Sequence, residues 1–335
     1  MTPKVSAMDW TYLSGLVAAR EGRMLTREFF RQLASEPDLD AVLHRLGETV
    51  FENRLPDAAA VQRLDEIAAE ILAECAAELR GLCPSDVATC HFDVKEAFAD
   101  LRGFVEKRRA GADGPEPSPE SEPDEGEGVW ERLWDGLPAD VPDSVRRAAL
   151  RARDVLPAAA EQPELLDAAI DAECLRALRE EAERRGNDFI TGYWRRAETA
   201  RALESLWRAR LLGLEQAVQD ALVGDLQDGA LVENLARADE ADWPDVLGAA
   251  VPGVQAARLR DLRGAARVRE FVRQMDEALA DYVRQARSVA FGPERVFGYA
   301  IGMQTEVFNL KLMVGGRAAD VAPALLEERL RPGYV

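Results

Sequence analysis

Apolar residues recur at helical spacing along most of the chain, as in the stripe formed by Leu39, Val42, Leu43 and Leu46. Residues three or four positions apart share one face of a helix, so this pattern predicts amphipathic helices. Several helices are expected between residues 8 and 55. Further ones are expected at 58–80, 92–109, 144–155, 163–185, 189–214, 229–238, 244–249 and 255–289. No stretch alternates long enough to predict a strand, and the pattern indicates an all-α protein.

The segment from Val296 to Val314 is different because it is apolar on nearly every face, and such a helix is a buried one. Its polar exceptions are few: Gln304, Thr305, Glu306, Asn309 and Lys311. As a membrane span it would place Glu306 and Lys311 near the middle of the bilayer, where charges are costly. We therefore expect a buried helix of a soluble protein. Burial requires Glu306 and Asn309 to be hydrogen-bonded.

Glycine, proline and small polar residues predict where several helices begin and end. Gly292-Pro293 predicts a helix start near Pro293 or Glu294, and Gly315-Gly316 predicts its C-cap. A short helix from about Pro323 to Leu330 is expected next, stopped by Pro332. Elsewhere, Thr26 predicts an N-cap, and Gly186-Asn187 predicts the end of the helix at 163–185.

One segment, Gly111 to Gly128, interrupts the helical pattern. Its sequence, GADGPEPSPESEPDEGEG, is rich in acids and prolines and has no large apolar side chain. Such a composition cannot bury a core, so we expect a disordered linker or surface loop. An acidic interaction tail is the alternative interpretation.

Composition narrows the possible functions. An apolar fraction of 47% is enough for real cores, and a net charge of −19 repels phosphate backbones. We therefore expect no nucleic acid partner. The first residues, MTPKVSAMDWTYL, lack the basic and apolar regions of a signal peptide, which predicts a cytoplasmic protein.

The motifs of common enzymes and metal sites are missing from the sequence. None of its four cysteines forms a Cys-x-x-Cys pair: Cys75, Cys83, Cys90 and Cys174. Cys83 with Cys90-His91 is a metal-site alternative, but the spacing fits no zinc pattern, so buried free thiols are expected. Phosphate-binding loops, dinucleotide fingerprints and nucleophile elbows are absent. We predict no catalytic residue, no cofactor, no metal and no direct nucleotide binding.

Internal periodicity is the strongest feature that the residues alone provide. An apolar-Asp pair is expected to begin a long helix three times, at spacings of 106 and 105 positions: Leu64-Asp65, Ile170-Asp171 and Met275-Asp276. A following helix carries an acid at spacings of 105 and 108 positions: Asp93, Glu198 and Glu306. An apolar residue stands eight positions after each acid: Leu101, Leu206 and Val314.

The repeat predicts three similar helical domains. The expected segments are 1–110 for the first copy, 111–128 for the linker, 129–225 for the second copy and 226–335 for the third. Parts of residues 1–55 are expected to be able to pack with the third copy.

The C-terminal string GPERVFGYAIGMQTEVFNLKLMVGG…LLEERLRPGYV resembles the C-terminus of the C subunit of the V-type/A-type ATP synthases, called the d subunit in the eukaryotic vacuolar ATPase. The matching positions are Glu306, Asn309, Gly315-Gly316, Arg329-Leu330 and Tyr334-Val335. Near the start, Tyr12 and Arg20 match the opening of the family. Met303-Gln304 stands where the family usually carries Lys-Glu.

The resemblance implies three helical domains around a pseudo-threefold axis, with a funnel-like shape. It implies a non-catalytic linker of the central rotor, bound to the stalk subunits D and F and to the proteolipid ring of the membrane. Such a protein is peripheral, lies on the cytoplasmic side of the membrane and couples ATP hydrolysis or synthesis to movement of H⁺ or Na⁺. A non-enzymatic helical scaffold or adaptor outside the rotary ATPases is the first alternative that the sequence leaves open. A helical enzyme, which would need a pocket with convergent polar groups, is the second.

Overall fold

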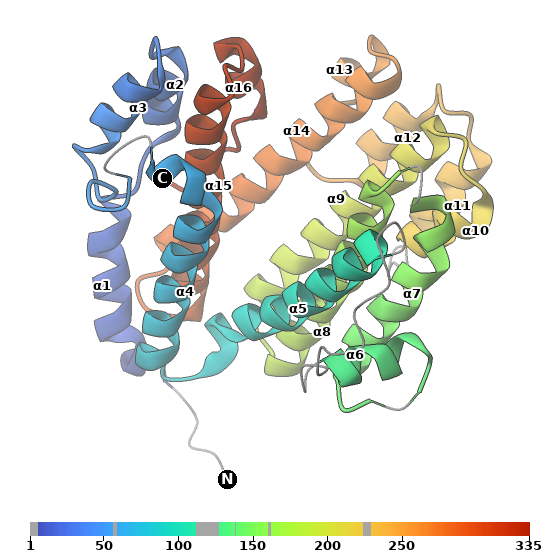
Figure 1. The fold of residues 1–335 in the computed structure, drawn as a ribbon, viewed down its shortest axis with the longest axis horizontal. Coiled ribbons are helices and arrows are strands. Elements are labelled where there is room, and N and C mark those ends of the chain that lie inside the picture. The colour runs from blue at the N-terminus through green and yellow to red at the C-terminus, as the bar shows by residue number, and fades with distance from the viewer. Residues whose placement is uncertain (1–5, 56–58, 112–126, 138, 160–161, 224–228) are drawn as a thin grey trace. The chain divides into compact units, whose positions relative to one another are not determined.

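The computed structural model describes residues 6–55, 59–111, 127–137, 139–159, 162–223 and 229–335. These residues form sixteen α-helices and no strand (Figure 1), which confirms the all-α prediction. The chain divides into two compact units. Unit 1 is Met1–Thr89 together with Asp276–Val335, and unit 2 is Cys90–Met275. The predicted pseudo-threefold symmetry and the predicted domain segments stay predictions.

Unit 1 is built from both ends of the chain. Its N-terminal α-helices are α1 (Thr11–Glu21), α2 (Arg27–Ser35), α3 (Leu39–Leu46) and α4 (Leu64–Leu82). Its C-terminal α-helices are α15 (Pro293–Ala318) and α16 (Pro323–Arg329), preceded by the last part of α14 (Gly264–Arg284). Short 3-10 turns complete it at Ala7–Trp10, Ala60–Arg63, Asp86–Ala88 and Gln285–Ser288.

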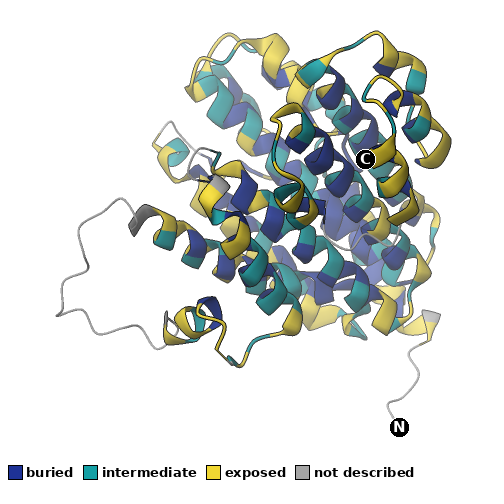
Figure 2. Ribbon diagram, turned by 90° about the vertical axis from the view of Figure 1, so that its right-hand side faces the viewer, coloured by how far each residue is buried: buried dark blue, intermediate teal, exposed yellow. Residues whose placement is uncertain are grey.

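Helix α15 lies at the centre of unit 1, as its apolar pattern predicts. It packs against α1, α2, α3, α4 and α16 (Figure 1). Phe297, Leu310 and Met313 are fully buried along it. Buried and exposed positions lie on opposite faces of the more peripheral helices (Figure 2), which is the arrangement that amphipathic spacing predicts.

Several predicted helix ends are confirmed and one is wrong. The Phe29 amide donates to Thr26 Oγ1 over 3.2 Å, and Gly186 ends α8 in the left-handed region at a φ of 70°. The predicted cap at Gly315-Gly316 is wrong because α15 continues through both residues to Ala318. Gly316 instead gives room for α16, since a Cβ atom there would collide with the side chain of Leu326.

Unit 2 contains the middle of the chain. Its α-helices are α5 (Cys90–Gly111), α6 (Glu127–Trp134), α7 (Asp143–Ala159), α8 (Glu164–Arg185), α9 (Asp188–Leu211), α10 (Gln216–Val223), α11 (Gly229–Arg237), α12 (Trp243–Ala250), α13 (Ala256–Arg260) and the first part of α14. The most extensive packing joins α8 to α7 and to α9. The ring of Phe104 lies 6.2 Å from that of Trp130 and 5.9 Å from that of Trp134, so these two tryptophans contact the same neighbour.

The repeat anchors occupy different places in their helices. Leu64 begins α4, but Ile170 lies within α8 and Met275 lies within α14, so the prediction that all three pairs begin a helix is wrong. The residues eight positions past the acids, Leu101, Leu206 and Val314, are all buried.

Residues 112–126 of the predicted linker lie outside the described residues. Within the described part of the chain, no helix combines the length and the apolar character needed to cross a membrane.

Candidate functional site

Two polar side chains of α15 are buried inside unit 1, as the sequence predicts. Glu306 and Asn309 are 4% and 0% exposed. The backbone amide of Leu25 donates to Glu306 Oε1 over 2.8 Å. Asn309 bonds the backbone of Arg331 twice at 3.0 Å, donating through Nδ2 to its carbonyl and accepting from its amide at Oδ1. These bonds tie α15 to segments near each end of the chain.

The environment of Glu306 changes its protonation. Burial raises its pKa to about 7, although the hydrogen bond from the Leu25 amide acts in the opposite direction. The carboxyl group lines a cavity of about 290 Å³. Apolar walls of this cavity come from Met24, Phe51, Ile71 and Met303. An acid in this setting changes charge near neutral pH.

Tyr334 lies against two glycines of α15. A Cβ atom at Gly298 would be 2.9 Å from the Tyr334 hydroxyl oxygen, and one at Gly302 would be 2.7 Å from Tyr334 Cβ. The Tyr334 hydroxyl group donates to Glu21 Oε1 over 3.0 Å, and Arg295 Nη2 lies 2.6 Å from Glu21 Oε2. Burial raises the pKa of the Tyr334 hydroxyl, and the carboxylate of Glu21 raises it further. Tyr334 is therefore a neutral donor that connects α15 to α1.

Arginine side chains contact the C-terminal segment that carries Tyr334. Arg284 donates twice to the carbonyl oxygen of Gly333, from Nε over 3.0 Å and from Nη2 over 2.7 Å. The Arg287 guanidinium lies 5.9 Å from the centre of the Tyr334 ring, and that of Arg331 lies 3.7 Å from the Phe308 ring. Both distances are within the range of cation–π attraction. The segment after α16 is thus fixed by backbone, ring and charge contacts together.

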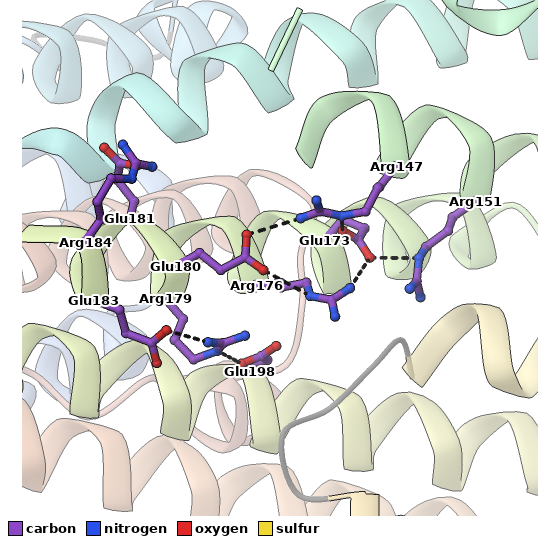
Figure 3. Close-up of polar contacts among 10 residues, drawn as sticks. All are labelled: Arg147, Arg151, Glu173, Arg176, Arg179, Glu180, Glu181, Glu183, Arg184 and Glu198. Atoms are coloured by element: carbon purple, nitrogen blue, oxygen red, sulfur yellow. Dashed lines mark hydrogen bonds and ion pairs between the residues drawn. The ribbon is translucent and has the colours of Figure 1, made fainter. Parts of the chain in front are cut away.

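Unit 2 contains a network of ion pairs (Figure 3). Its centre is Glu173 of α8, which is 1% exposed. Arg151 and Arg147 of α7 approach this carboxylate with their Nε atoms at 2.7 and 3.0 Å, and Arg176 Nη1 lies 3.4 Å away. Three guanidinium groups compensate one buried carboxylate, which joins α7 to α8 through charge-assisted hydrogen bonds.

A second group of ion pairs joins α8 to α9. Arg179, which is 4% exposed, donates from Nε to Glu198 Oε2 over 2.6 Å and from Nη1 to Glu183 Oε2 over 2.9 Å. Burial raises the pKa of Glu198, against the effect of Arg179. Arg201 Nη2 of α9 contacts Asp171 Oδ2 at 2.7 Å. The acids of the repeat anchors Glu198 and Asp171 therefore have arginine partners.

Three of the four cysteines have thiols whose pKa is raised by burial. Burial raises the pKa of Cys75 and Cys174 to about 11 and that of Cys83 to about 12. A thiol with so high a pKa carries little thiolate at neutral pH and is a poor nucleophile. Among the described residues, no group of three or more His, Cys, Asp and Glu side chains is placed to hold a metal ion. The expectation that catalytic, cofactor and metal sites are absent stays a prediction.

Large apolar side chains are exposed near the start of α1 and before α15. Met8 and Tyr12 are 76% and 71% exposed, and Phe291 is 46% exposed. The Gly292 amide donates to Ser14 Oγ over 3.4 Å, which brings the backbone next to Phe291 close to α1. Contiguous exposed apolar patches often mark an interaction surface.

Comparison with protein families gives a match over nearly the whole chain. The family of the ATP synthase (C/AC39) subunit matches residues 13–329. The chain belongs to this family. Comparison with curated protein sequences gives no match.

The structure gives several of the residues that carry the resemblance to the C/AC39 family a structural role. Glu306 and Asn309 hold the backbone at Leu25 and Arg331, and Gly316 admits Leu326. Arg20 pairs with Glu78 through both terminal nitrogens, whereas Tyr12 is exposed.

Sequence reasoning missed the contacts that Glu21 and Arg295 make within this C/AC39 chain. Glu21 is buried, and its partners Arg295 and Tyr334 lie 274 and 313 positions away along the chain. A carboxylate inside the amphipathic pattern of α1 was the available signal, because an acid on a buried face needs a partner.

Proposed function

We propose that this chain is a non-catalytic linker in the central rotor of a V-type/A-type ATPase or ATP synthase. It joins the stalk subunits D and F to the proteolipid ring on the cytoplasmic side of the membrane. It thereby couples ATP hydrolysis or synthesis to translocation of H⁺ or Na⁺. The observation that carries the proposal is the family match over residues 13–329.

The physical requirement for such a linker is resistance to twisting, and the construction of each unit supports it. Unit 1 has a close-packed core around α15, and close-packed cores deform little. Unit 2 adds the ion pairs centred on Glu173 and Arg179, which connect α7, α8 and α9. Charge-assisted contacts fix the relative position of packed helices.

A linker also needs surfaces for its partners. We propose that the exposed side chains of Met8, Tyr12 and Phe291 are part of one. Tyrosine is enriched among residues that dominate binding energy at protein interfaces.

The decisive measurement is ATP-driven ion uptake into vesicles that contain the assembled enzyme with or without this protein. Hydrolysis of ATP is measured in parallel. We expect hydrolysis to persist in the soluble head and ion uptake per ATP to be lost when the protein is absent. Unchanged uptake per ATP in its absence would contradict the proposal.

A further inference from the structure

The hydrogen bond between Glu306 and Leu25 joins two parts of unit 1 that lie 281 positions apart in the chain. Leu25 lies in the turn between α1 and α2, and Glu306 lies in the middle of α15. Glu306 Oε1 accepts the Leu25 amide hydrogen over 2.8 Å, and no other described residue hydrogen-bonds to this carboxyl group. Glu306 also lines the cavity, which gives solvent a route toward its side chain. One buried acid thus holds the turn and can exchange a proton with solvent.

The other charged and titratable groups of the cavity wall come from five parts of unit 1: Arg20 of α1, Arg23 of the turn, Arg54 of the segment before α4, Glu74 of α4 and Tyr299 of α15. Arg20 is paired with Glu78, and Arg54 is paired with Glu74. In the described part of unit 1, helices α2, α3 and α16 contribute no charged side chain to this wall. No arginine forms an ion pair with Glu306 there, and the group that favours its charged form is the Leu25 amide.

We propose that Glu306 and the Leu25 amide form a proton-sensitive contact that fastens the α1–α2 turn to α15. When Glu306 is ionised, the Leu25 amide donates to a charged acceptor, and such hydrogen bonds are shorter and stronger than neutral ones. When Glu306 takes up a proton from solvent through the cavity, it becomes a neutral acceptor, and the hydrogen bond from the Leu25 amide becomes longer and weaker. The change occurs near neutral pH because burial raises the pKa of Glu306 to about 7. This device goes beyond the proposed function and does not depend on it.

The sequence allows the contact to be observed directly. Met24-Leu25 is the one place in the chain where leucine follows methionine. Full-length protein labelled with ¹³C at the methionine carbonyl and ¹⁵N at leucine therefore gives one carbonyl-filtered amide signal, that of Leu25. The signal is followed by NMR from about pH 5 to about pH 9, a range that covers the raised pKa.

We expect the Leu25 amide proton to move downfield as pH rises, with a midpoint near 7. The signal should be constant in Glu306→Gln, which keeps an acceptor but cannot ionise. Glu327→Gln is the matched control because Glu327 is exposed on α16, and it should titrate like the unmodified protein.

A titration that is already nearly complete at pH 5, as the ordinary glutamate pKa of 4.5 gives, or the same titration in Glu306→Gln, would overturn the proposal. If Glu306→Gln does not fold, Glu306→Asp is used instead. Its shorter side chain keeps the charge but withdraws it from Leu25, so the shift should become smaller. An undiminished shift in Glu306→Asp would equally overturn the proposal.

Discussion

The ring of Tyr334 occupies the space that a side chain at Gly302 would need. A Cβ atom at Gly302 would lie 2.7 Å from Tyr334 Cβ and 2.8 Å from Tyr334 Cγ and Cδ1. Real Cβ atoms do not approach other atoms so closely, so either the ring or α15 would have to move. The absent side chain is therefore what lets Tyr334 reach Glu21.

We expect Gly302→Ala to destabilise the protein. Overpacking a filled core costs about 1–3 kcal/mol, which exceeds the gain of about 1 kcal/mol from replacing a helical glycine by alanine. The control is Gly15→Ala in α1, where a Cβ atom would meet nothing within 4 Å, and it should gain about 0.5–1 kcal/mol. Urea unfolding measures both variants. A Gly302→Ala protein as stable as Gly15→Ala would contradict the close packing of Tyr334.

Glu306 should make stability depend on pH in the neutral range. Its pKa is about 7 in the folded protein and near 4.5 in the unfolded chain. Between pH 4.5 and pH 7, Glu306 is mostly protonated in the folded protein and mostly ionised in the unfolded chain. The free energy of unfolding therefore falls as pH rises, by roughly 3 kcal/mol in total. Glu306→Gln should remove this decrease and be the more stable protein above pH 7. The measurement is the difference in unfolding free energy between the two proteins across pH; a difference that does not vary with pH would refute it.

Glu173 should contribute strongly to the stability of unit 2. In Glu173→Gln, the guanidinium groups of Arg147, Arg151 and Arg176 lose their shared carboxylate. Removing one partner of a buried ion pair costs about 3 kcal/mol or more. The control is Glu233→Gln, because Glu233 pairs with Arg237 in an exposed contact worth no more than about 0.5 kcal/mol. Chemical denaturation followed by tryptophan fluorescence compares them, and equal losses would show that the network adds no stability.

Tyr12 should matter for assembly and little for folding. Because its side chain is 71% exposed, Tyr12→Ala should change the free energy of unfolding by no more than about 0.5 kcal/mol. If Tyr12 contributes to a partner interface, its removal should weaken binding by about 1 kcal/mol or more. Binding of the isolated protein to stalk and ring preparations tests this, with Leu325→Ala, exposed on α16, as the control. Unaltered affinity for both partners would remove Tyr12 from the proposed surface.

The helices of this protein were largely predictable because their apolar spacing is regular. The burial of Glu306 and Asn309 was predictable too, since a helix apolar on nearly all faces leaves its few polar residues inside. The end of α15 was not predictable. Gly315-Gly316 has the composition of a cap, and only the packing of Leu326 shows that Gly316 serves a close helix approach.

Contacts between distant segments could not be predicted from local patterns. The Glu21–Tyr334 hydrogen bond joins residues 313 positions apart, and no helical or strand period relates them. The same is true of the hydrogen bond from Leu25 to Glu306, although the expectation that Glu306 needs a partner was available. The cost of burying a carboxyl group predicts that Glu21 and Glu306 need hydrogen-bond partners. Which residues are those partners is determined by the tertiary fold.

The composition of unit 1 from Met1–Thr89 and Asp276–Val335 has a consequence for protein synthesis. Helices α1 to α4 leave the ribosome long before α15, the helix against which they pack. Their apolar faces therefore stay uncovered until all of unit 2 has been translated. Unit 2 is an unbroken stretch of chain and can fold during that time. A nascent chain halted before α15 would expose those faces and be a natural substrate for chaperones.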